Sequence, residues 1–297
     1  MRLFRFCLAA MLLVRPVWAD VPGVVVDIAP VHSLVAQVMG DVGAPQLLVA
    51  PRSSPHSYAL RPSQAHGLQN ADLVIWIGPE LTPWLSQPMA NLAGGADQIA
   101  LADHPATRTL ELRGNHDHEE DQHGHGGDID PHVWLDPENA SAWLPVIAEM
   151  LAGIDPANAA IYRANADAAQ DRLTEVTAEL ARTLEPVKNR PFITLHDAFQ
   201  YFEARFGLVS AGALTLGDAG GASPARVALL QDTVAGQGIH CAFREPQFDD
   251  RLLLAVAGDT LQIGTLDPIG STLQPGPDLY TGLLRDMAQS LASCPGN

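Results

Sequence analysis

The chain has 297 residues, with 34 acidic against 17 basic side chains and a formal net charge of −17 at pH 7. A surface this acidic repels nucleic acid and anionic membranes, which argues against both as partners. It is compatible with a cationic ligand or simply with solubility, and the length allows one large or two medium domains.

The first 19 residues have the pattern of a signal peptide. A basic start precedes the apolar run Phe6–Val14, and small residues lead to a cleavage expected after Ala19. A membrane anchor is the alternative, but the run is far shorter than the roughly 20 residues that cross a bilayer. Arg15 and Pro16 also interrupt it. We therefore predict that residues 1–19 are removed on export and that the mature protein is periplasmic.

The segment that follows alternates strand-like and helical stretches. The strand-like runs are Val24–Ile28, Gln46–Val49 and Leu73–Ile77, and the helical ones are His32–Met39, Ser63–Gln69 and Pro137–Ala152. Alternation of this kind is typical of βα units around a mostly parallel sheet. We predict a first α/β lobe over residues 20–154.

One stretch of this lobe, Gly114–Gly127, has no apolar residue and cannot pack into a core. We predict a surface loop there. Its histidines are His116, His118, His123 and His125. Imidazoles on an acidic chain suit Zn²⁺, Cu²⁺ or Ni²⁺, so auxiliary metal binding is one interpretation and a solvated charged loop is the other.

A long helix is expected next. Asp155 is a candidate N-cap with Pro156 at the first helical position, and neither glycine nor proline occurs from there to Glu185. Apolar residues at three- and four-residue steps form one stripe: Leu173, Val176, Leu180 and Leu184. About 30 residues span roughly 45 Å, enough to link two lobes. We predict a linking helix over 155–186 and a second lobe over 187–297.

The second half repeats the alternation without a recognisable sequence repeat of the first. Its predicted strands are Phe192–Leu195, Leu208–Ala211, Ile239–Phe243 and Leu261–Thr265, and its predicted helices are Pro224–Ala235, Arg251–Gly258 and Leu279–Leu291. The fold class predicted for the whole chain is therefore α/β, with two lobes of mostly parallel strands.

Two cysteines remain after Cys7 leaves with the signal peptide. Cys241 and Cys294 in an exported chain favour a disulfide between the strand Ile239–Phe243 and the C-terminus.

The chain has four potential metal ligands at comparable positions: His56, His132, His196 and Asp267. Three of them stand at the ends of predicted strands, and His132 directly follows the His-rich loop. Ligands of open α/β sheets bind at the carboxyl ends of strands, and three imidazoles with one carboxylate would suit tetrahedral Zn²⁺. Singly, each histidine is more often an ordinary hydrogen-bonded residue. Together the four make a metal site the alternative interpretation. Glu245, at the end of another predicted strand, is a candidate supporting carboxylate.

Several motifs resemble one family. His-Ser-Tyr-Ala-Leu-Arg-Pro-Ser-Gln (56–64), Asp-Pro-His-Val-Trp-Leu-Asp-Pro (130–137), Thr-Leu-His-Asp-Ala-Phe-Gln-Tyr-Phe (194–202), Glu-Pro-Gln-Phe (245–248) and Leu-Asp-Pro-Ile-Gly (266–270) occur in this order. They are similar to motifs of the zinc-binding solute-binding proteins of bacterial ABC importers. These are the ZnuA-like group and its AztC-type relatives, within the metal-binding cluster A-I family.

The resemblance implies metal ligation by His56, His132 and His196, and two lobes joined by a rigid helix with metal in the cleft. It implies delivery of Zn²⁺ to the membrane permease of an ABC importer. One departure is Pro55, where some zinc-specific members carry an acidic residue; Asp267 or water then becomes the fourth ligand. Manganese-binding relatives have a carboxylate in place of His196, so imidazole there favours zinc.

Two other functions stay open. A zinc hydrolase needs an open coordination position and a general base, for which Glu245 is a candidate, but the chain has no His-Glu-x-x-His motif. A periplasmic zinc buffer or chaperone without an importer would also fit the His-rich loop. We expect a monomeric transport protein without enzymatic activity, and a zinc metallochaperone is a conceivable further partner.

Overall fold

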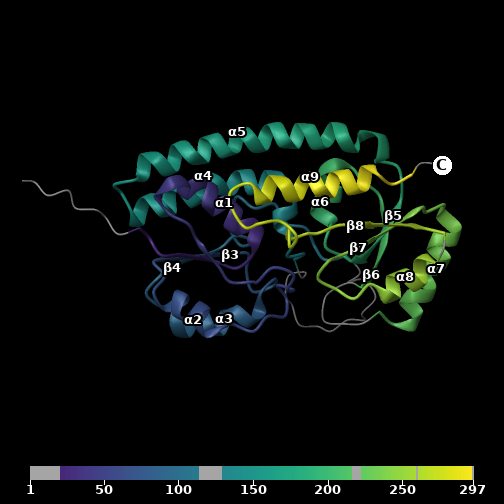
Figure 1. Ribbon diagram of the computed structural model, residues 1–297, viewed down its shortest axis with the longest axis horizontal. Helices are drawn as coiled ribbons and strands as arrows, with labels where there is room; N and C mark the ends of the chain where they lie inside the picture. The colour runs from purple at the N-terminus through teal and green to yellow at the C-terminus, as the bar shows by residue number, and fades with distance from the viewer. Residues whose placement is uncertain (1–20, 114–128, 216–221, 259, 296–297) are drawn as a thin grey trace, which may run out of the picture.

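The computed structural model describes residues 21–113, 129–215, 222–258 and 260–295. The predicted signal peptide and the His-rich loop lie outside these residues. Within them the chain forms two α/β halves joined lengthwise by helices, as Figure 1 shows. The predicted fold class is thereby confirmed.

The first half contains a four-stranded sheet in the order β2-β1-β3-β4, with every pairing parallel. Its strands are β1 (Val24–Val26), β2 (Gln46–Leu47), β3 (Leu73–Trp76) and β4 (Asp97–Ala100). Its helices are α1 (Ala29–Met39), α2 (Pro62–Gln69), α3 (Ser86–Leu92) and α4 (Pro137–Ile154). The edge strand β4 was not predicted, because half of it is exposed and polar and it lacks the apolar run of the inner strands.

The second half contains a sheet of the same design, in the order β6-β5-β7-β8, again parallel throughout. Its strands are β5 (Phe192–His196), β6 (Ser210–Thr215), β7 (Cys241–Arg244) and β8 (Gln262–Thr265). Its helices are α6 (Gln200–Phe206), α7 (Pro224–Gln237), α8 (Arg251–Ala257) and α9 (Leu279–Ala292). The two halves thus repeat one topology that their sequences do not reveal.

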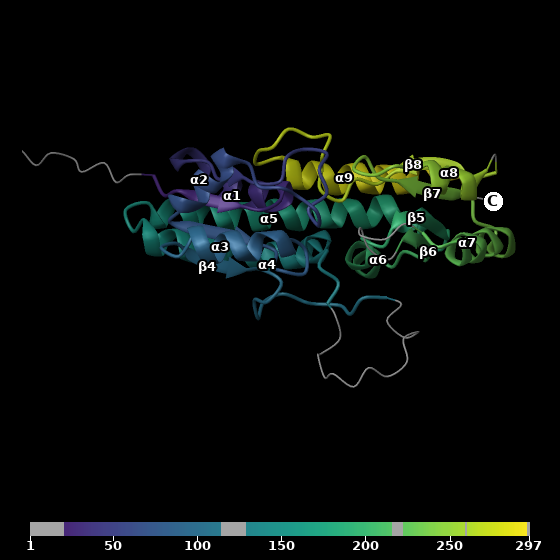
Figure 2. The same cartoon turned by 90° about the horizontal axis from the view of Figure 1, so that it is seen from below.

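The long helix α5 (Ala159–Leu184) runs along both halves with α9 beside it (Figures 1 and 2). Its 26 residues span about 39 Å, and all four residues of the predicted stripe are buried. The predicted start was wrong. Asp155 closes α4 instead of capping α5, and its carboxylate accepts hydrogen bonds from Asn158 and Tyr162, both at 2.7 Å.

No helix in the described part of the chain is both long and apolar enough to cross a lipid bilayer.

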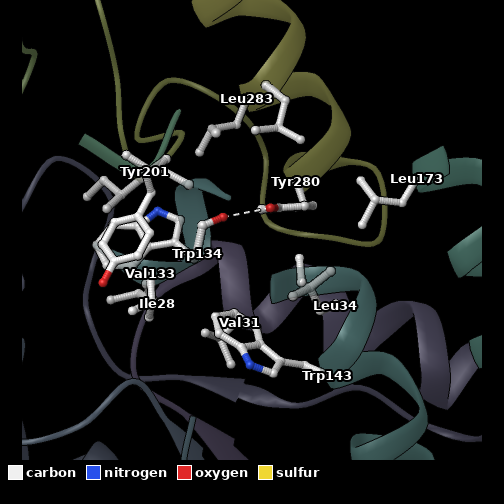
Figure 3. Close-up of a cluster of buried hydrophobic side chains, with 14 of the residues drawn as sticks. Ile28, Val31, Leu34, Val133, Trp134, Trp143, Leu173, Tyr201, Tyr280 and Leu283 are labelled. Carbon is white, nitrogen blue, oxygen red and sulfur yellow. Dashed lines mark hydrogen bonds between the residues drawn. The ribbon is translucent and has the colours of Figure 1, made fainter. Parts of the chain in front are cut away.

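A continuous apolar core lies where α1, α4, α5 and α9 meet. Trp134 and Tyr280, far apart in sequence, are both fully buried there, and the Tyr280 hydroxyl donates a 2.6 Å hydrogen bond to the Trp134 carbonyl (Figure 3). The Trp134 indole donates in turn to the carbonyl of Pro268, at 2.6 Å. These contacts fix the chain just after His132 against the C-terminal segment.

The predicted disulfide is present. It joins Cys241, the first residue of β7, to Cys294, two residues beyond the end of α9, across a Cα–Cα distance of 5.9 Å. Both cysteines are buried. The bond therefore ties α9 to the sheet of the second half.

Candidate metal centre

Three histidines from different parts of the chain converge between the two halves. His56 lies between β2 and α2, His132 directly precedes a short 3₁₀ helix (Val133–Leu135), and His196 is the last residue of β5. Their ring centroids are 4.9, 5.4 and 5.9 Å apart. One ligand nitrogen from each lies within 4.8 Å of the others. Tetrahedral Zn²⁺ holds imidazole nitrogens roughly 3.3 Å apart, so these side chains are close to a binding arrangement.

The segment carrying His56 is held by its own half of the molecule. The Trp84 indole donates a 2.7 Å hydrogen bond to the Pro55 carbonyl, and the His56 amide donates to Ser54 Oγ at 3.2 Å. The side chain of Gln64 donates to the Leu48 carbonyl and, at 3.2 Å, to the Tyr58 hydroxyl. Tyr58 and Gln64, which follow His56 in its motif, therefore stabilise this loop.

His132 is held by Asp130, two residues earlier. Asp130 Oδ1 lies 2.7 Å from His132 Nδ1 and also accepts the His132 amide at 3.0 Å. Both side chains are buried, and burial raises the pKa of Asp130 to about 6. A protonated Nδ1 facing this carboxylate leaves the Nε2 lone pair for a metal.

His196 has an equivalent partner from a different strand. Glu245 directly follows β7, and its Oε2 lies 3.2 Å from His196 Nδ1. Glu245 is 2% exposed and His196 is 3% exposed. Metal-bound histidines usually carry such a carboxylate, which fixes the ring and makes it a better ligand. Two of the three histidines thus have the surroundings of metal ligands. Of the two carboxylates, sequence reasoning named Glu245 and missed Asp130.

Asp267, the predicted fourth ligand, does not join the three histidines. Its Oδ1 accepts from Gln247 Nε2 at 2.7 Å, and its Oδ2 accepts from Ser271 Oγ at 2.8 Å and the Thr272 amide at 3.2 Å. The carboxylate is thus held by the turn after β8, and its ligation of a metal stays a prediction. The other predicted ligands, His116, His118, His123 and His125, lie outside the described residues.

A small cavity of about 10 Å³ adjoins the histidines. Its lining comprises Pro55, His56, His132, Trp134, His196, Glu245, Gln247, Phe248, Pro268 and Ile269. No lysine or arginine is among these lining residues. Apolar neighbours on the same walls shield the site from water.

Ion pairs also cross between the two halves. Arg113 contacts Asp197, next to His196, and donates to Glu203 of α6 at 2.6 Å. Arg205 binds both oxygens of the buried Asp136, at 2.7 and 2.8 Å. These pairs join residues roughly 70 to 90 positions apart, and no local sequence pattern predicts them.

We expect Asp130→Asn to lower zinc affinity by about 10- to 100-fold, the usual cost of losing a partner behind a ligand. An amide can turn its NH₂ group toward His132 and no longer secures the tautomer with Nε2 free. Competition titration with a chromogenic chelator measures the change. Asp103→Asn, an exposed change outside the cluster, is the control. Wild-type affinity in Asp130→Asn would show that the carboxylate does not support the ligand.

The two parallel-sheet halves, the long helix between them and the histidines in the cleft define a metal-binding solute-binding protein. Residues 24–294 match the family described as "ZnuA: Zinc-uptake complex component A periplasmic". The chain belongs to this family.

Relatives and solved structures agree with this assignment. The high-affinity zinc uptake system protein ZnuA of Paracoccus denitrificans is 44% identical over 95% of this chain and 94% of its own, and that of Brucella abortus is 38% identical over 92% and 91%. The crystal structure of a zinc-bound ZnuA deletion mutant has a TM-score of 0.79 at 26% identity, covering 94% of this chain and 99% of that one. The periplasmic zinc-binding protein TroA of Treponema pallidum, at 22% identity and a TM-score of 0.78 over 91% and 98% of the two chains, shares the fold.

Proposed function

We propose that this protein captures Zn²⁺ in the periplasm with His56, His132 and His196 and delivers it to the membrane permease of an ABC importer. The observation that carries the proposal is the convergence of three imidazoles, two of them backed by buried carboxylates. The family to which the chain belongs is the periplasmic component of zinc uptake. The ligands come from both predicted lobes, 20–154 and 187–297, so a bound ion would bridge them.

The ligand chemistry favours zinc over manganese. Imidazole nitrogen suits Zn²⁺, whereas Mn²⁺ prefers oxygen ligands. The two nearby carboxylates, Asp130 and Glu245, each face the Nδ1 atom of a histidine. The set of three nitrogens is therefore more selective for zinc than a mixed nitrogen and oxygen set would be.

Transport accounts for the site better than catalysis. A zinc hydrolase needs a general base beside a metal-bound water. Glu245, the candidate base, lies against His196 Nδ1 and so orients a ligand. We propose that the protein acts as a monomeric carrier after loss of the signal peptide, with no catalytic role. A metallochaperone that loads it stays a prediction.

The test of this function is metal stoichiometry combined with uptake. We expect the mature protein to keep one tight zinc per chain after deletion of Asn115–His125, because the proposed ligands His56, His132 and His196 lie outside the deleted segment. Chelator competition and metal analysis of the purified protein measure this. The deletion variant should also support growth of a zinc-limited strain that lacks its own carrier. Loss of tight binding on deletion would place the site in the His-rich segment instead, and growth failure despite tight binding would argue for a zinc buffer.

A further inference from the structure

Gln247 lies on a wall of the cavity that adjoins the three histidines. Its Oε1 is shielded from solvent and accepts no hydrogen bond from the residues that the structure describes. Its Nε2 donates a 2.7 Å hydrogen bond to Asp267 Oδ1. A buried carbonyl oxygen without a hydrogen-bond donor destabilises the folded state, so its presence beside the histidines calls for an explanation.

The orientation of this amide follows from chemistry. An ionised carboxylate only accepts hydrogen bonds, so the NH₂ group of Gln247 must face Asp267 and its oxygen must point elsewhere. Asp267 is in turn fixed by the turn after β8, through Ser271 Oγ at 2.8 Å and the amides of Thr272 and Ile269 at 3.2 and 3.3 Å. The carboxylate therefore acts as a rigid anchor for the amide.

The chain on either side of Gln247 also belongs to the site. Glu245 contacts His196 Nδ1, and the Phe248 ring packs edge-on against the His196 imidazole at a centroid distance of 5.6 Å. The Phe248 amide donates to the Glu245 carbonyl at 3.3 Å, which closes a turn around Gln247. Three of the four residues of this turn thus face the same histidine or its cavity.

We infer that Gln247 presents its neutral side-chain oxygen to the fourth side of the bound zinc ion, and that Asp267 is a positioning residue that acts only through Gln247. The inference rests on the zinc site proposed above. A cation, or a water molecule that it binds, supplies what the buried oxygen lacks. A neutral oxygen there, unlike a carboxylate, adds no negative charge to hold the ion.

A double-mutant cycle separates this arrangement from direct ligation by Asp267. In a chain lacking Asn115–His125, we expect Gln247→Ala to lower zinc affinity about tenfold and Asp267→Ala to lower it no further than that. The double variant should match Gln247→Ala alone. A further tenfold loss when Asp267→Ala is added to Gln247→Ala would show that Asp267 reaches the ion itself, and would overturn the inference.

Two further measurements separate positioning from a general structural role. Cobalt substituted for zinc should give the same altered visible spectrum in Gln247→Ala and Asp267→Ala. The first change removes the Gln247 oxygen, and the second releases the amide from the carboxylate that positions it. Gln247→Met keeps the bulk of the side chain and should behave as Gln247→Ala, which guards against a packing defect. Gln231→Ala, an exposed glutamine of α7, is the matched control.

The outcomes also distinguish this inference from the proposed function. If Gln247→Ala and Gln247→Met both keep wild-type affinity and cobalt spectrum while His56→Ala loses zinc, the inference is wrong and the zinc site stands. If His56→Ala also retains affinity, the proposed zinc site itself is wrong.

Discussion

Replacing His132 by alanine is expected to lower zinc affinity by well over about a hundredfold. Loss of a residue that merely supports a ligand already costs 10- to 100-fold, and loss of the ligand itself removes a metal–nitrogen bond. His132 is 4% exposed and its ring is held by Asp130, so the alanine variant loses a ligand whose position is fixed. Zinc should then no longer raise the melting temperature of the variant, because that rise depends on binding to the folded state.

The experiment compares His56→Ala, His132→Ala and His196→Ala in a chain that lacks Asn115–His125. The deletion prevents the His-rich segment from masking a loss in the cleft. His66→Ala is the matched control, since His66 is exposed on α2 and its side-chain contacts are with Asn70. Each of the three variants should lose tight binding while the control keeps it. Wild-type affinity in any one of them would remove that residue from the ligand set.

Removal of the disulfide is expected to lower the free energy of unfolding by about 4 kcal/mol. The Cys241–Cys294 bond closes a segment of 53 residues, and the chain-entropy model gives this value for a loop of that length. The melting temperature should fall by roughly 10 °C, at about 2–4 °C per kcal/mol for a protein of this size. Thermal and urea unfolding of the Cys241→Ser/Cys294→Ser double variant measure the effect.

Zinc affinity should change less than about threefold in the same variant. Cys241 begins β7 and Glu245 follows its other end, so the disulfide and the metal site lie at opposite ends of the strand. Chemical reduction of the wild type provides an independent route to the same state. If the double variant is as stable as the wild type, the disulfide adds no stability beyond that of the packed core.

Much of this fold could be read from patterns along the chain. Buried parallel strands appear as apolar runs, and the stripe along α5 has helical spacing, so both were placed within a few residues. His56, His132 and His196 were found because each stands beside a predicted strand or in a recognisable motif. Asp155 was misassigned because the same residue can start one helix or end another, and the choice depends on Tyr162, which lies a turn into α5.

The polar contacts around the site could not be predicted from the sequence, because they join residues that are distant along the chain. Asp267 follows a strand as His196 does, but its surroundings include Gln247 and Ser271, which the spacing of motifs does not bring together. The pairing of Arg113 with Asp197 and Glu203 joins residues more than 80 positions apart. Only the three-dimensional structure shows which of these polar side chains form hydrogen bonds with one another.

The polar contacts between the halves bear on how quickly the ion leaves. The Tyr201 hydroxyl of α6 accepts from the Leu110 amide at 2.8 Å and donates to the Asp130 carbonyl at 2.9 Å, which links the segment before His132 to the half that carries His196. Among the three histidines His56 is half-buried whereas the other two are buried, and it lies on a loop that Trp84 holds by a hydrogen bond. Unloading would then begin with detachment of that single imidazole, and the exit rate would be set by a loop and not by rotation of whole lobes.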